Sequence, residues 1–194
     1  MAGLKSLLKE TAIYGISSIL GRFLNYMLVP IYTNAMSAAQ GGYGVVTEVY
    51  AWVALLLVIL TYGMETTFFR FINKEGGNPK RTYSTVLYML GFSSSIFVFF
   101  SLLFLPAISD AMGYADHPWY VGTMLIVVAM DAFQCVPFAY LRYKKKAWHF
   151  AGLKMLFIVL NITLNLIYYV FMGGSDVFYA FILNLVCTGF IMLL

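Results

Sequence analysis

Charge is the scarcest property of this sequence. Only 10% of its 194 residues are charged, whereas a typical soluble domain carries about 25%. Hydrophobic residues make up 62% of the chain, and the mean hydropathy is +0.84. A soluble domain has no interior that could bury so much apolar surface. The composition therefore excludes a soluble globular protein and predicts an all-α, polytopic membrane protein.

Cysteine is scarce as well, and the signatures of enzymes are missing. Cys135 and Cys187 stand in apolar segments without metal or redox spacing, so we expect packing residues rather than metal ligands. The sequence has no phosphate-binding glycine loop, no HExxH and no GxSxG. We therefore expect no catalytic residue, no metal and no cofactor. The net charge of +4 does not indicate nucleic acid, because the basic residues stand between apolar segments.

Long apolar runs are what the sequence does contain. Six of them follow one another, at residues 11–35, 44–71, 82–108, 118–141, 150–171 and 176–194. A helix needs about 20 apolar residues to cross a bilayer, so the runs predict six membrane spans with short connections. Residues 1–10 lack the cleavage site of a signal peptide, so we expect the first span to stay in the membrane.

The basic residues favour one orientation of these spans. Lysine and arginine concentrate on the cytoplasmic side of a membrane. The loops after the first, third and fifth spans contain neither residue. Except for Arg22, the basic residues stand at the other ends of the spans: Lys5, Lys9, Arg70, Lys74, Lys80, Arg81, Arg142, Lys144, Lys145, Lys146 and Lys154. This alternation predicts six crossings with a cytoplasmic N-terminus.

Two charged residues are predicted near the middle of the bilayer. At 1.5 Å per residue, Arg22 lies about 16 Å along the first span and Asp131 about 15 Å from the same face along the fourth. The hydrocarbon core is about 30 Å thick. Charges at this depth usually face a bundle interior or a wet cavity. We expect Arg22 and Asp131 to share a polar cavity, or alternatively to form a salt bridge that only fixes helix packing.

A second set of charges stands toward the cytoplasmic end of the second span. Glu65 and Arg70 are five residues apart, so they do not share a helix face well, since facing pairs come at three or four residues. Arg70 could extend to the lipid headgroups. Glu65 is predicted to lie deeper, where it could pair with Arg22 or Arg70, or carry a proton.

Amides form a further set of polar candidates. Asn161 and Asn165 stand four residues apart on the fifth span, Asn184 is on the sixth, and Asn25 is on the first. Intramembrane amides often form hydrogen bonds between helices, and contact with a substrate is the alternative. Pro30 and Pro137 interrupt the first and fourth spans and are candidate hinges or static kinks.

The start of the chain also carries a family resemblance. The run LKETAIYGISSILGRFLNYMLVPIYT and the later GGYGVVTEVYAWVALLLVILTYGMETTFFRF resemble the beginning of bacterial polysaccharide flippases. These are the Wzx-like, O-antigen-unit transporters of the MOP superfamily, which also contains the MATE exporters. The resemblance is densest over residues 4–72 and continues through LRYKKKAWHF. It therefore covers most of the chain.

The resemblance implies a fold and a cargo. Flippases of this kind have two six-helix lobes around a central cavity and move a lipid-linked oligosaccharide to the outer leaflet by alternating access. Arg22 and Arg70 match arginines of the family pattern, so by resemblance they would hold the substrate's diphosphate. The chain departs from the family because it contains only the first lobe. The resemblance thus implies a missing second lobe or a homodimer in the bacterial inner membrane, with membrane lipids and the pathway's glycosyltransferases or polymerase as partners.

Three functions remain open at this point. The first is a flippase for a polyprenyl-diphosphate-linked polysaccharide repeat unit, with Arg22, Arg70, Asp131, Glu65, Asn25, Asn161 and Asn165 as cavity candidates. The second is a cation-coupled multidrug exporter of the MATE type, in which Asp131 and Glu65 would bind the coupling ion. The third is a scaffold of a polysaccharide synthase complex that transports nothing.

Overall fold

The described part of the chain is built from helices. The computed structural model describes residues 11–16, 19, 26–36, 38, 41–74 and 78–194, and these contain no β-strand. In chain order the elements are α2 (Val29–Ala35), α3 (Gly42–Thr61), α4 (Met64–Ile72), α5 (Pro79–Leu103), α6 (Leu105–Ala111), α7 (Pro118–Tyr143), α8 (Ala147–Leu166), the π-helix η2 (Ile167–Phe171) and α9 (Phe178–Met192). Residues 11–16 are also helical.

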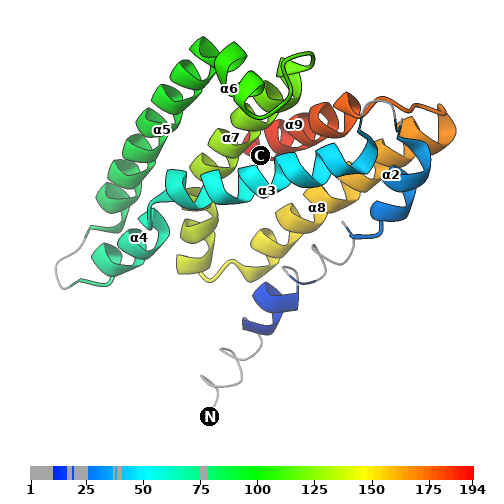
Figure 1. Ribbon diagram of the computed structural model, residues 1–194. Coiled ribbons are helices and arrows are strands. Elements are labelled where there is room, and N and C mark those ends of the chain that lie inside the picture. The colour runs from blue at the N-terminus through cyan, green and yellow to red at the C-terminus, as the bar shows by residue number, and fades with distance from the viewer. Residues whose placement is uncertain (1–10, 17–18, 20–25, 37, 39–40, 75–77) are drawn as a thin grey trace.

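Helix α7 is the centre of the bundle. It contacts α3, α4, α5, α6, α8 and α9, and Figure 1 shows it between α5 on one flank and α8 with α9 on the other. The helix is apolar around most of its circumference, as expected of a helix buried by its neighbours. Pro118 in its first turn suits the start of a helix, because the proline nitrogen has no proton to leave unsatisfied.

Four helical segments are long and apolar enough to cross a membrane: Gly42–Ile72, Pro79–Leu103, Pro118–Tyr143 and Ala147–Phe171. They overlap the spans predicted at 44–71, 82–108, 118–141 and 150–171. The sixth predicted span, 176–194, contains the shorter apolar helix α9 of 15 residues. The first, 11–35, lies only in part within the described residues. An all-helical fold with several apolar helices typical of a polytopic membrane protein is therefore confirmed, whereas six spans are not.

Two of the predicted spans contain breaks. Within the predicted span 82–108, α5 stops at Leu103 and α6 begins after Phe104. Pro106 stands in the first turn of α6, where its missing N–H costs no helical hydrogen bond. In the second span, Tyr62 and Gly63 adopt left-handed backbone conformations (φ 31° and 72°) and separate α3 from α4.

The two prolines proposed as interruptions behave differently from each other. Helix α7 runs through Pro137 from Pro118 to Tyr143 without ending. Pro30 stands in the first turn of α2, directly after the turn at Met27 and Leu28 that follows the helical Tyr26, and its fixed φ fits the helix start.

Two apolar clusters hold the helices in place. One joins α2, α3, α7, η2 and α9 through buried residues such as Val49, Val128 and Phe181. The other joins α4 and α5 to the C-terminal half of α7 around the fully buried Phe68. The break at Tyr62–Gly63 therefore separates a helix packed in the first cluster from a helix packed in the second.

Candidate functional site

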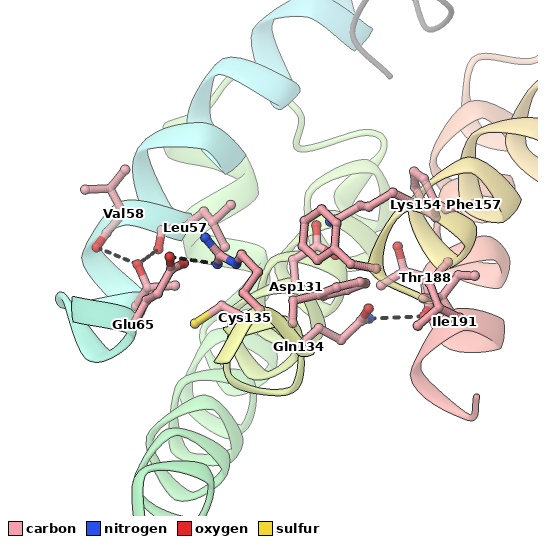
Figure 2. A pocket seen from close by; sticks show the side chains of 15 residues that line it. Leu57, Val58, Glu65, Asp131, Gln134, Cys135, Lys154, Phe157, Thr188 and Ile191 are labelled. Carbon is pink, nitrogen blue, oxygen red and sulfur yellow. Dashed lines mark hydrogen bonds and ion pairs between the residues drawn. The ribbon is translucent and has the colours of Figure 1, made fainter. Parts of the chain in front are cut away.

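A cavity of about 550 Å³ lies among α3, α4, α7, α8 and α9. Its lining combines apolar and aromatic side chains with four charged ones, and Figure 2 shows these side chains from close by. The charged residues are Glu65, Asp131, Arg142 and Lys154. All four belong to helices that are long and apolar enough to cross a membrane. Charges in such segments usually mark a functional site.

Glu65 and Arg142 form a direct ion pair across the cavity. The Oε1 atom of Glu65 lies 2.7 Å from a terminal nitrogen of Arg142, and their side chains remain 41% and 31% exposed. Glu65 stands in the first turn of α4 and Arg142 in the last turn of α7. Each charge is thus at the helix end that favours its sign. The guanidinium also lies 5.8 Å from the ring centre of Phe69 and 5.7 Å from that of Phe150, so α4, α7 and α8 all hold it in place.

Asp131 and Lys154 face the same cavity from α7 and α8. Their opposite charges attract each other, but within the described part of the chain Glu65–Arg142 is the one direct ion pair. The Lys154 ammonium lies 4.2 Å from the centre of the Phe138 ring, which stabilises a cation in an apolar wall. Asp131 and Lys154 therefore attract each other across the cavity without forming a direct ion pair.

The amides form a hydrogen-bond network beside the cavity. Gln134 donates to the Thr188 carbonyl (3.2 Å) and the Thr188 hydroxyl donates to Asn184 (3.3 Å). Asn184 in turn donates to the Tyr50 hydroxyl. These bonds connect α7 and α9 to α3.

A second network involves the predicted pair Asn161 and Asn165. The Tyr32 hydroxyl donates to Asn165 (2.8 Å), and the Asn165 amide donates to the Asn161 carbonyl (2.8 Å). Both asparagines are buried and neither lines the cavity. Their geometry fits the interpretation that they connect helices.

The structure brings together only some of the predicted site residues. Glu65 and Asp131 both line the cavity. Arg70 is exposed on α4 and does not line it. Arg22 and Asn25 lie outside the described residues, so the expected sharing of a cavity by Arg22 and Asp131 stays a prediction.

Sequence reasoning missed Arg142 and Lys154 as cavity residues. It counted them with the basic residues around the loop between the fourth and fifth spans, but both stand within helices. A signal was present on α7, because Asp131, Cys135, Phe138 and Arg142 follow each other at intervals of four, three and four residues. That spacing places them on one helix face, and all four line the cavity.

Comparison with known proteins adds no relative: no protein-family model matches the sequence, and no curated protein or solved structure matches it. The resemblance to polysaccharide flippases therefore stays a prediction.

Proposed function

We propose that this chain is a lobe of a membrane transporter that moves a polyprenyl-diphosphate-linked oligosaccharide across the bacterial inner membrane. The observation that carries the proposal is the cavity with Arg142 and Lys154 on its wall. It lies among helices long enough to cross a membrane. A guanidinium binds phosphate oxygens through two parallel hydrogen bonds and stays charged at all physiological pH values. The family resemblance of the N-terminal stretch supports the same cargo.

The ion pair gives this site a simple mode of exchange. In the structure the Glu65 carboxylate is bound to a terminal nitrogen of Arg142. A diphosphate offers the same kind of oxygen acceptor with more negative charge. On entering the cavity it would therefore displace the Glu65 carboxylate from the Arg142 guanidinium. Lys154 would bind a second phosphate oxygen as a point charge. Arg22, predicted at the depth of Asp131, would add a further cation.

A second helical bundle is part of this proposal. Alternating access requires one bundle to move against another around the substrate site. We propose that a second lobe or a second copy of this chain completes the transporter, with the N-terminus in the cytoplasm and the pathway's glycosyltransferases or polymerase as partners.

A cation-coupled exporter is the second candidate, and one observation favours it. Asp131 and Glu65 line the same cavity, and a cation could bind between two such carboxylates. In that case Asp131→Asn would abolish efflux of a cationic dye. A flippase would not export the dye in that assay, and its lipid transport would still depend on the concentration of its cargo.

The test is lipid movement in vesicles reconstituted with the full protein. The probe is a fluorescent polyprenyl-diphosphate disaccharide, and its accessibility to an external quencher reports transbilayer movement. We expect Arg142→Gln and Lys154→Gln each to lower the rate at least about tenfold, the size of one lost charged contact. Arg81→Gln removes an exposed cation at the start of α5 and should leave the rate unchanged.

Two results would contradict the proposal. Equal rates in the two cavity variants and in Arg81→Gln would remove the phosphate-binding role. No lipid movement at all in correctly folded wild-type protein, together with co-purification of glycosyltransferases, would support the scaffold instead.

A further inference from the structure

A second hollow of about 510 Å³ lies on another side of α7, between α5, α8 and α9. We call it the α7–α8 groove. Its walls are mostly apolar and include Phe133, Pro137 and Leu141 of α7 and Leu153 of α8. In the described part of the chain no helix besides these four contributes to its lining. Pro137 has a short side chain and Gly152 has none, and both line the groove.

The groove follows α7 from Phe133 to Leu141, a rise of about 12 Å. From Phe133 to the turn that begins at Lys144 the helix rises about 16 Å, and half of a hydrocarbon core is about 15 Å. The groove and the turn beyond it together match the depth of about one leaflet. That length suits a single acyl chain.

Cations gather where the groove reaches the surface. Lys144, Lys145 and Lys146 form the exposed turn between α7 and α8, and His149 lines the end of the groove. Trp148 beside them is 70% exposed, as is usual for a tryptophan at the headgroup level. Basic pockets between membrane helices on the cytoplasmic side recognise anionic headgroups.

We propose that the α7–α8 groove binds an anionic phospholipid, with one acyl chain along Phe133, Pro137 and Gly152 and the phosphate at the lysine turn. The lipid is a resident of the inner leaflet and not the transported cargo. Phe138, Leu153 and Ile191 line both the groove and the charged cavity and stand between them as a partition. Phe138 and Ile191 are only 8% and 7% exposed, so a headgroup in the cavity could not have its chain in the groove without displacing them.

Gly152 offers a precise way to fill the groove. A Cβ atom added there would meet no heavy atom within 4 Å, and the same holds at Gly44 of α3. Gly152→Phe starts from a Cβ that has room, and its ring should occupy the place of the acyl chain. Gly44→Phe is the matched control, because it makes the same change in an exposed helical position away from the groove.

The experiment measures lipid retained by the purified full chain after delipidation and exposure to equal amounts of phosphatidylglycerol and phosphatidylcholine. Native mass spectrometry counts the bound lipid. We expect wild-type protein and Gly44→Phe to retain phosphatidylglycerol in preference to phosphatidylcholine, and Gly152→Phe to lose at least four fifths of it. Changing the three lysines of the turn to Gln should lower phosphatidylglycerol affinity by about fivefold per lysine and remove the preference over phosphatidylcholine.

A second measurement uses wild-type protein and therefore does not depend on the folding of a variant. Phosphatidylglycerol with a diazirine on its acyl chain should label wild-type peptides between Phe133 and Leu153. Unchanged retention in Gly152→Phe, equal retention of the two phospholipids, or labelling elsewhere would overturn the proposal. Preferential labelling of the groove by a polyprenyl phosphate would also overturn it, because the groove would then belong to the cargo.

Discussion

The ion pair between Glu65 and Arg142 leads to the sharpest prediction about this structure. It can be tested by a double-mutant cycle of Glu65→Gln, Arg142→Gln and the combined variant. Two unit charges about 4 Å apart attract by about 4 kcal/mol at an effective dielectric constant of about 20, and by about 1 kcal/mol in water. The side chains are 31% and 41% exposed, so solvent screens part of this attraction. We expect a coupling free energy of about 1–2 kcal/mol, above the value of roughly 0.2–1 kcal/mol for exposed pairs.

The cycle separates the charge interaction from the packing of the arginine. Arg142→Gln also removes the contacts with Phe69 and Phe150, so this variant should lose more stability than Glu65→Gln. Those contacts cancel in the coupling term, because they are lost in the single and in the double variant alike. Unfolding in mixed micelles with increasing sodium dodecyl sulfate, followed by the fluorescence of the three tryptophans, gives each free energy.

The sequence supplies a matched control cycle. Glu65 and Arg70 stand on one helix without an ion pair between them, so Glu65→Gln and Arg70→Gln should be additive within about 0.5 kcal/mol. A coupling of Glu65 to Arg70 that equals or exceeds its coupling to Arg142 would refute the arrangement described here. So would a Glu65–Arg142 coupling below about 0.3 kcal/mol.

Three further predictions concern other contacts. Tyr32→Phe removes a buried hydrogen bond to α8 and should cost about 0.6–1.7 kcal/mol in the same unfolding assay; no change would show that this bond does not hold α2. Phe68→Ala empties a fully buried site and should cost about 3–5 kcal/mol, whereas Phe71→Ala, at 51% exposure, should cost far less; equal costs would contradict the second cluster. Burial and the hydrogen bond to Glu48 raise the pKa of Tyr114, outside the long helices, to about 12. The stability that Tyr114 contributes is present below the ordinary pKa of about 10 and is lost as the pH rises toward 12. Site-specific NMR of the labelled ring should show the raised pKa. An ordinary pKa in wild-type protein would contradict the prediction.

Much of the helical architecture is predictable because long apolar runs leave the backbone no alternative to a helix in lipid. Hydropathy does not predict where, within such a run, one helix ends and the next begins. Tyr62 and Phe104 both stand inside predicted spans, yet the backbone leaves the α-helical conformation at these residues. The break after Phe104 had a local signal in Pro106, which cannot stand deep inside a helix without loss of a hydrogen bond.

The candidate site is only half predictable for a different reason. Glu65 and Asp131 are conspicuous because a carboxylate is costly in an apolar segment. Their neighbours Arg142 and Lys154 stand close enough to the predicted loop to be counted as ordinary cytoplasmic charges. The pairing of Glu65 with Arg142 joins residues of different helices, and a single sequence contains no measure of which helices lie side by side.

The break at Tyr62–Gly63 has a consequence for bilayer thickness. The segment Gly42–Ile72 has 31 residues and would be about 46 Å long as one straight rod, against a hydrocarbon core of about 30 Å. An unbroken helix of that length would have to tilt or stretch the lipid around it. Because the segment is divided at Tyr62–Gly63 into two helices that each pack in a cluster of their own, it does not have to cross the bilayer as one straight rod.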